Sequence, residues 1–253
     1  MRRAWTAAVV MCAFAAAQSG PAYPVAGIVS AANYQGGPFA PNDVLAIFGT
    51  NLSWSEQALG AGDILSGSLP WQLGNGEVLV DNWPAPLYYV SPSQINFMVP
   101  SNLGPGDVTI QVVREGVIGP PVTVTLVDAA PELFELNGYA IATHLDYSLI
   151  TTDNPAHGGE IVVLYGAGFG QTVPNVGVGE IPDAAARVVG DVSVLLNGTA
   201  VDSGEILYAG VTPGCAGLYQ INLTLPDAPG SDPEIRVAVG AQTSRAGLLL
   251  AVQ

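Results

Sequence analysis

The sequence predicts an all-β protein made of two tandem immunoglobulin-like antiparallel β-sandwiches related by internal duplication. Three observations predict this fold: short apolar or alternating segments recur along the chain, turn residues separate them, and one motif occurs twice. The 253 residues include 31 glycines and 20 prolines without a Gly-x-y period, which indicates many tight turns and excludes collagen. No convincing amphipathic helix follows the N-terminal segment, and short strands at regular spacing are typical of β-sandwiches.

The duplicated motif has the sequence Gln-Ile-Asn. It lies in residues 94–100 and again in residues 220–226, and in both places it continues into alternating residues and then a proline. An earlier apolar run also occurs twice, at residues 44–49 and 161–166, and each copy ends in an aromatic residue and a glycine. Two matching segments in the same order indicate that one β unit was duplicated.

Further strands follow from alternation and from turn residues. Residues 108–112 and 122–126 alternate between apolar and polar side chains, which predicts strands with one buried face. Asn197-Gly198 favours a type I′ turn after a strand at 192–196. Additional strands are expected at 206–209, 235–239 and 248–252, a hairpin at 139–150, and pairing of 77–81 with 86–90 across a turn at 82–84.

The predicted units extend over residues 24–129 and 130–253, with a boundary near Ala129-Ala130-Pro131. Little sequence separates them, so we expect the units to be packed together or stiffly joined. Once the N-terminal segment with Cys12 is removed, Cys215 is alone, so no internal disulfide is expected. Stability must then come from the cores, where each buried valine, leucine or isoleucine contributes about 1.5–3 kcal/mol.

The first 17 residues have the pattern of a secretory signal peptide. Arg2 and Arg3 precede a short apolar run at residues 7–14, and small residues at 15–17 follow it. The run is shorter than the roughly 20 apolar residues that a membrane-spanning helix needs. We therefore expect cleavage after Ala17, a secreted, extracellular or periplasmic location, and no transmembrane segment in the mature chain.

The charge balance excludes one class of partner. The chain has six arginines, no lysine and 21 acidic residues, which gives a net charge of −15. Nucleic acids and anionic lipids are bound through lysine and arginine, so such a surface repels them. No nucleic acid is expected among the partners.

The sequence carries no motif that specifies a reaction. It lacks the phosphate-binding loop, the zinc-hydrolase motif, the Cys-x-x-Cys pair, the EF-hand loop and the nucleophile elbow. We expect no catalytic residue, no metal site and no cofactor. The residues His144, Asp146 and His157 lie in the region between the units, and a deep pocket lined by them and by carboxylates would be needed to support a hydrolase.

The polar residues of the duplicated motif form one group of candidate residues. Gln94 and Asn96, like Gln220 and Asn222, alternate with apolar residues, so each pair shares one face of a strand. Their amides donate and accept hydrogen bonds. Because the pair occurs in both units, we interpret these four residues as a structural motif that holds the preceding loop, at 91–93 or 213–217.

Three tryptophans form the second group of candidate residues. Trp54, Trp71 and Trp83 all lie in the first unit, at expected loops or turns. Exposed aromatic side chains at loop tips stack on sugar rings or anchor a protein partner. The alternative interpretation is that each indole covers one end of its own sandwich, because isolated aromatic residues are ordinary on protein surfaces.

An ordered set of motifs also identifies a related family. The motifs are Ala31-Ala32-Asn33-Tyr34, residues 41–49, residues 84–96, Val99-Pro100 and residues 214–222. With them the chain resembles the C-terminal domain that is abundant in secreted proteins of Solibacter and other acidobacteria. That family resembles tandem immunoglobulin-like units of the IPT/TIG type. The resemblance implies a secreted β-sandwich protein and transfers no catalytic residue.

Together these patterns predict a secreted, non-enzymatic immunoglobulin-like protein of the bacterial cell exterior, which serves in binding, adhesion or as a structural spacer. Its expected partner is an extracellular protein or a glycan. The alternative function is a carbohydrate-binding accessory protein that uses the three tryptophans of the first unit.

Overall fold

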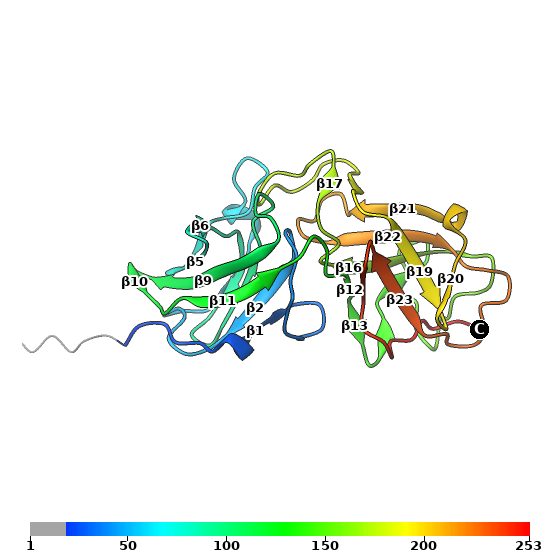
Figure 1. Ribbon diagram of the computed structural model, residues 1–253, viewed down its shortest axis with the longest axis horizontal. Helices are drawn as coiled ribbons and strands as arrows, with labels where there is room; N and C mark the ends of the chain where they lie inside the picture. The colour runs from blue at the N-terminus through cyan, green and yellow to red at the C-terminus, as the bar shows by residue number, and fades with distance from the viewer. Residues whose placement is uncertain (1–18) are drawn as a thin grey trace, which may run out of the picture.

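The computed structural model describes residues 19–253. The predicted signal peptide lies outside the described residues and stays a prediction. Figure 1 shows two β units side by side along the long axis, the first in blue to green and the second in green to red. The prediction of an all-β chain with tandem immunoglobulin-like sandwiches is confirmed. No helix among residues 19–253 has the length and apolar character required to cross a membrane.

The first unit contains two antiparallel sheets. One has the order β1 (Ile28–Ser30), β2 (Val44–Phe48), β8 (Gln94–Met98), β7 (Leu87–Val90), β3 (Gln57–Ala58). The other has the order β10 (Val117–Ile118), β9 (Gly106–Arg114), β5 (Gly76–Val80), β4 (Gln72–Leu73), with β11 (Val122–Leu126) on β9 and β6 (Trp83–Pro84) on β5. Two short 3₁₀ helices, η1 (Val25–Gly27) and η2 (Ala61–Asp63), lie in its connections.

The second unit repeats this arrangement. Its larger sheet has the order β12 (Glu132–Leu133), β16 (Ile161–Ala167), β22 (Tyr219–Thr224), β21 (Ile206–Val211), β18 (Arg187–Val188), β17 (Thr172–Val173), with β15 (Ala142–Thr143) on β16. The facing sheet has the order β20 (Thr199–Ala200), β19 (Val192–Leu196), β23 (Ile235–Val239), β24 (Gln242–Thr243). A small hairpin of β13 (Glu135–Leu136) and β14 (Tyr139–Ala140) and the 3₁₀ helix η3 (Ser203–Glu205) complete it.

Each unit has its own apolar core between its sheets. The first cluster of buried side chains draws on residues 23–126 and includes Ile47, Ile95 and Phe97. The second draws on residues 129–252 and includes Ile221 and Leu223. The change from one cluster to the other falls between residues 126 and 129, next to the expected boundary. The strands of the duplicated motif alternate between buried and partly exposed residues, as one-sided burial requires.

Two strand predictions differ from the structure. Residues 77–81 do not pair with 86–90, because β5 pairs with β6 and β9 whereas β7 pairs with β8 and β3 in the other sheet. Asp81 and Asn82 both have positive φ, so the turn closes at once and sets Trp83 opposite Val80. Residues 248–252 form isolated bridges to Tyr139, Ala156 and Glu234 and no continuous strand. The Asn197-Gly198 hairpin is confirmed, with positive φ at both residues.

A third apolar cluster joins the units. Leu69 and Met98 of the first unit pack with Ala216 of the second, beside Leu59, Tyr88 and Ile181. We call this contact the seam, defined by residues 67–69, 88 and 98 of the first unit and 179–181 and 216–217 of the second. Backbone bonds cross it from Leu69 N to Gly179 O at 2.8 Å and from Ile181 N to Gly67 O at 2.8 Å.

The two units pack closely at the centre of the seam. The Tyr88 hydroxyl donates to Ala216 O at 2.8 Å. Gly217 has a φ of +65°, and a Cβ added there would lie 2.7 Å from Val44 Cγ2. Because both the backbone conformation and the close approach require glycine, the turn of the second unit fits tightly onto β2 and β8 of the first. The two units are therefore in direct and close contact at the seam.

Candidate functional site

The duplicated motif builds an amide and aromatic surface on the outer face of the first sheet. Phe48 of β2 lies opposite Gln94 of β8, and Tyr89 of β7 lies opposite Asn96. Residues directly opposite in an antiparallel pair point to the same side of the sheet. We call Phe48, Tyr89, Gln94 and Asn96 the first amide face.

The second unit carries the same surface in the same register. Tyr165 of β16 lies opposite Gln220, and Tyr208 of β21 lies opposite Asn222. We call Tyr165, Tyr208, Gln220 and Asn222 the second amide face. In both units a β-bulge immediately precedes the tyrosine of the third strand, between Leu87 and Tyr89 and between Ile206 and Tyr208. A bulge re-aims the residue that follows it, so the matching bulges place equivalent tyrosines beside equivalent asparagines.

The amides of each face bind each other. Gln94 Nε2 donates to Asn96 Oδ1 at 2.9 Å, and Gln220 Nε2 donates to Asn222 Oδ1 at 3.0 Å. The expectation that these side chains hold the preceding loop is therefore wrong. Ser91 holds that loop instead, because its Oγ accepts from Gln94 N at 2.9 Å. Side chains two residues apart on a strand reach each other more easily than they reach backward past the strand end.

Each amide pair keeps one free donor and one free acceptor. Gln94 Oε1 and Asn96 Nδ2 make no hydrogen bond within residues 19–253, and neither is among the buried unpartnered atoms. The same holds for Gln220 Oε1 and Asn222 Nδ2. These groups reach solvent, so each face offers an acceptor and a donor side by side.

The first amide face is the more open of the two. Phe48 is 38% exposed, and its ring lies 6.1 Å from that of Tyr34, which is 61% exposed. In the second face, Tyr165 Oη lies 3.4 Å from Thr143 Oγ1. The Arg187 guanidinium lies 5.2 Å from the ring centroid of Tyr208. Neighbouring side chains therefore cover more of the second face.

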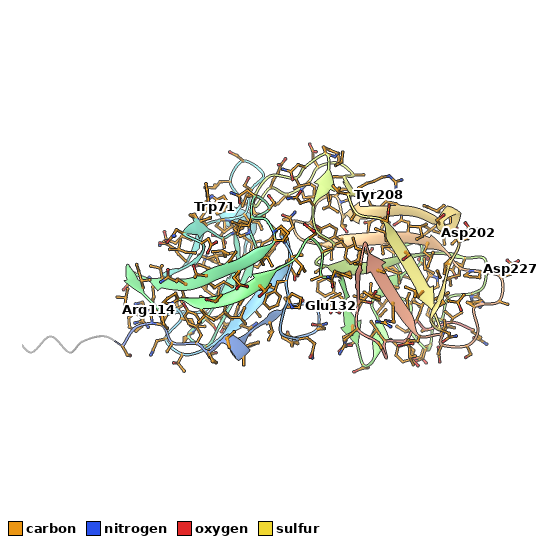
Figure 2. The ribbon with its side chains drawn as sticks, viewed as in Figure 1. Trp71, Arg114, Glu132, Asp202, Tyr208 and Asp227 are labelled. Atoms are coloured by element: carbon orange, nitrogen blue, oxygen red, sulfur yellow. The ribbon has the colours of Figure 1, made fainter. Side chains whose placement is uncertain are left out.

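The three tryptophans have separate surroundings. Trp54 stacks on Arg114, with 3.7 Å between the guanidinium carbon and the ring centroid, and its Nε1 donates to Glu115 at 2.8 Å. Trp71 lies beside Gly179 of the second unit, and Trp83 lies on β6 opposite Val80. Figure 2 shows Trp71 near the top of the first unit and Arg114 at its far end. All three indoles are exposed, and their ligand-binding role stays a prediction.

The histidine region has no arrangement of a nucleophile and a base. His144 Nδ1 contacts a carboxylate oxygen of Glu160, and its Nε2 lies 3.3 Å from Asn154 O. The Ser148 hydroxyl donates to Asp146 at 2.6 Å. Both ring nitrogens are thus engaged, and the nearest hydroxyl bonds a different carboxylate. Among residues 19–253, no group of three or more His, Cys, Asp or Glu side chains is placed to hold a metal ion.

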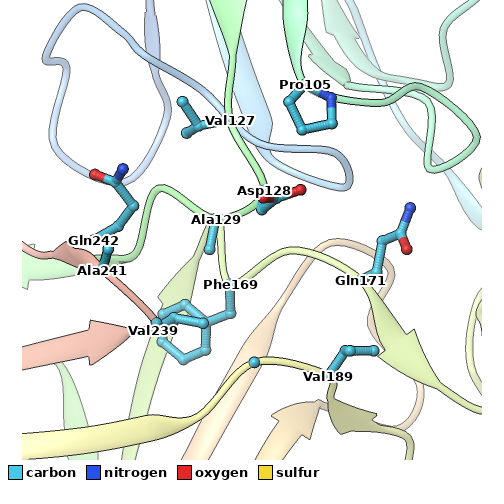
Figure 3. A pocket seen from close by; sticks show the side chains of 12 residues that line it. Pro105, Val127, Asp128, Ala129, Phe169, Gln171, Val189, Val239, Ala241 and Gln242 are labelled. Atoms are coloured by element: carbon cyan, nitrogen blue, oxygen red, sulfur yellow. The ribbon is translucent and has the colours of Figure 1, made fainter.

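The histidines also do not line the cavity where the units meet. This cavity has a volume of about 460 Å³ and is shown in Figure 3. Its wall is apolar apart from a few side chains; the residues that line it include Pro105, Val127, Asp128, Phe169, Gln171 and Gln242. Its lining contains neither a histidine nor a serine.

The Glu160 carboxylate raises the pKa of His144 above its ordinary value of 6.5. The cause is the hydrogen bond from the imidazolium to Glu160. The stabilisation that this pair provides is therefore present below pH 6.5 and is lost as the pH rises through the raised pKa. In Glu160→Gln the pKa of His144 is expected to fall toward 6.5 in an NMR titration of the histidine ring signals. An unchanged midpoint would show that Glu160 does not hold the proton.

A second ionisable group lies buried where the units meet. Asp43 is 2% exposed, and an added Cβ at Gly168 of the second unit would lie 3.5 Å from its Oδ2. Burial raises the pKa of the Asp43 carboxyl well above its ordinary value, and the nearby charge of Glu132 raises it further. Asp43 Oδ1, Asn33 Nδ2 and Asn42 Nδ2 are buried without a hydrogen-bond partner in the described chain.

Sequence reasoning found the amides of the faces and missed their aromatic neighbours. The aromatic-glycine ends of the two apolar runs, at Phe48 and Tyr165, carried the available signal. Tyr89 and Tyr208 gave none, because a bulge decides which residue lies opposite the asparagine.

The exposed Cys215 lies in the turn beside the seam.

Comparison with known proteins gives only distant likenesses. No family model matches the sequence, and no curated protein matches it either. A surface glycan-binding protein from Prevotella bryantii matches at 13% identity over 92% of this chain and 42% of its own, with a TM-score of 0.28. A Bacteroides ovatus SGBP-B from a mixed-linkage glucan utilization locus, in complex with a mixed-linkage heptasaccharide, matches at 11% identity over 84% and 44%, with a TM-score of 0.33. The chain thus spans less than half of either protein.

A third solved structure contains two domains of a surface-layer protein. Domains 5-6 of the S-layer protein SbsC match at 13% identity over 92% of this chain and 98% of that fragment, with a TM-score of 0.28. With TM-scores of 0.28 to 0.33 these likenesses carry no argument, and the site is interpreted from its own residues.

Proposed function

We propose that this protein is a secreted, non-enzymatic binding and adhesion module of the cell exterior, in which two rigidly joined units present repeated amide faces to a partner. The observation that carries the proposal is the repetition of the faces. The core side chains of the motif strands, such as Ile95 and Ile221, account for folding. Folding does not require the same half-exposed aromatic and amide groups on the outer side of both units.

A role as a structural spacer alone fits the seam but leaves the faces unexplained. The seam fixes the orientation of the units, as a spacer requires. A binding role uses both features, since the seam sets the geometry and the faces supply the contacts. The alternative in which the tryptophans bind carbohydrate is supported less, because Trp54 already covers Arg114 with one side of its ring.

The proposal is tested by retention on immobilised protein. Wild type and a variant with Gln94→Ala, Asn96→Ala, Gln220→Ala and Asn222→Ala are each exposed to the native secreted fraction and to cell-envelope material from the same cells. We expect the wild type to retain a defined component and the variant to retain at least tenfold less. Gln72→Ala, which removes an exposed amide from β4, is the matched control. Equal retention by the wild type and the quadruple variant would contradict the proposal, and so would no retention by the wild type.

A further inference from the structure

We infer that each amide face is a binding site for a neutral polysaccharide, an inference that rests on the proposed function and names its ligand. The free groups of the faces determine this chemistry. Gln94 Oε1 accepts and Asn96 Nδ2 donates, and Gln220 and Asn222 repeat the pair. A sugar hydroxyl is both a donor and an acceptor, so neighbouring hydroxyls of one ring satisfy such a pair of groups.

The aromatic groups beside the amides supply the second part of a sugar site. Phe48 lies opposite Gln94, and Tyr89 lies opposite Asn96, on the same side of the sheet. Tyr34 extends the aromatic surface next to Phe48. Directly opposite side chains are about 5 Å apart at Cβ, so ring and amide lie within reach of one pyranose unit. The apolar C–H side of the sugar then packs on the ring while its hydroxyls bond the amides.

Charge selects a neutral ligand over an acidic one. The four residues of the first amide face carry no charge, and the whole chain has a net charge of −15. Uronic acids, phosphates and sulfates would meet repulsion without a cation to pair with. In the second face, the Arg187 guanidinium lies over Tyr208 and donates one hydrogen bond to Leu207 O at 2.9 Å. The first amide face therefore offers no cation to an anionic polymer, and the second is bordered by this single guanidinium.

Two sites in one chain favour a polymer over a short sugar. The units are packed together at the seam, so a polymer that spans both faces makes its second contact without ordering a flexible linker. The second contact then forms at a high effective concentration, which multiplies the affinity for a long ligand by about 10²–10⁴. A short oligosaccharide reaches only one face and lacks this gain.

The experiment compares the two faces with soluble neutral polymers. Glucomannan, arabinoxylan and soluble starch are the neutral probes, polygalacturonate is the acidic probe, and affinity electrophoresis gives the dissociation constants. We expect at least one neutral polymer to bind and polygalacturonate not to bind. The variant with Gln94→Ala and Asn96→Ala should bind that polymer at least tenfold more weakly. The variant with Gln220→Ala and Asn222→Ala should lose less, because the second amide face is more covered.

Two further measurements keep the result interpretable. Phe48→Ala should weaken binding as much as the variant with Gln94→Ala and Asn96→Ala does. Gln72→Ala should not change binding. Thermal melting verifies that each variant is folded. Binding of polygalacturonate, or a neutral polymer that both double variants bind as tightly as the wild type does, would overturn the inference. If no neutral polymer binds while the face variants still lose a secreted protein on the retention assay, the ligand class is wrong and the proposed function stands. If both assays show no dependence on the faces, both proposals fail.

Discussion

Arg114→Met is expected to lower the free energy of unfolding by about 3 kcal/mol. The Arg114 side chain is 1% exposed, and its two terminal nitrogens donate to Asn51 O and to Ser19 O, each at 2.7 Å. A hydrogen bond from a charged group is worth about 1.5–3 kcal/mol, and methionine keeps the volume but leaves both carbonyls without a donor. For a chain of this size, the melting temperature should fall by at least about 6 °C in calorimetry.

The same substitution removes the support of Trp54. The indole loses the guanidinium on which it stacks and keeps only its bond to Glu115. Arg114→Lys should not restore stability, because an ammonium group cannot reach two carbonyls and cover the ring in the same planar way. Trp54 fluorescence should shift to longer wavelength in both variants. A melting temperature of Arg114→Met within 2 °C of wild type would show that this buried arginine contributes nothing to stability.

Asp43→Asn is expected to stabilise the protein at neutral and alkaline pH and to have little effect near pH 4. The folded-state pKa of the Asp43 carboxyl is raised well above its ordinary value of 3.8, with burial as the main cause. The stability associated with the uncharged carboxyl is therefore fully present below pH 3.8 and is lost as the pH rises through the raised pKa. Asparagine has a similar shape and stays neutral, so the variant avoids this loss.

The groups that face Asp43 do not reverse the expected loss of stability with rising pH. Glu132 carries the same charge, and the Tyr219 hydroxyl is buried with a raised pKa of its own. The Arg245 guanidinium pairs with Glu135, and its charge and its backbone also act on Glu132. The measurement is the melting temperature from pH 4 to pH 9, with Asp153→Asn at an exposed position as the control. If wild type and Asp43→Asn melt in parallel over the whole range, Asp43 is ionised or solvated in the folded protein and the account of this contact is wrong.

The sequence was sufficient for the strands of the motif and insufficient for some of their pairings. Alternation and the repeated Gln-Ile-Asn placed β8 and β22, because one-sided burial depends only on the order of apolar residues. The partner of β5 was wrong because the choice between two sheets depends on long-range burial. Leu87 is buried in the core as part of the other sheet, and the positive φ values at Asp81 and Asn82 let Trp83 and Pro84 complete the hairpin.

The candidate site was predicted in part for a similar reason. The period of a strand placed Gln94 and Asn96 on one face, and the structure agrees. Their mutual hydrogen bond could not be predicted, because it depends on rotamers, and Tyr89 could not be matched to Asn96 without knowledge of the bulge. Nor did the sequence show that Trp54 stacks on Arg114. The two residues are 60 positions apart in the chain, and only the fold brings them together.

The unequal turns that precede β8 and β22 have a consequence for how the duplicated chain folds. Repeated units risk exchanging equivalent strands with each other while they fold. The turn between β21 and β22, at residues 212–218, is longer than the corresponding turn at 91–93, and it alone carries the glycine that fits against Val44. If β22 took the place of β8, this turn would move away from Val44 and the seam would not form. The asymmetry therefore gives the correct pairing an energetic advantage over the swapped one, so that each half of the chain folds with its own strands.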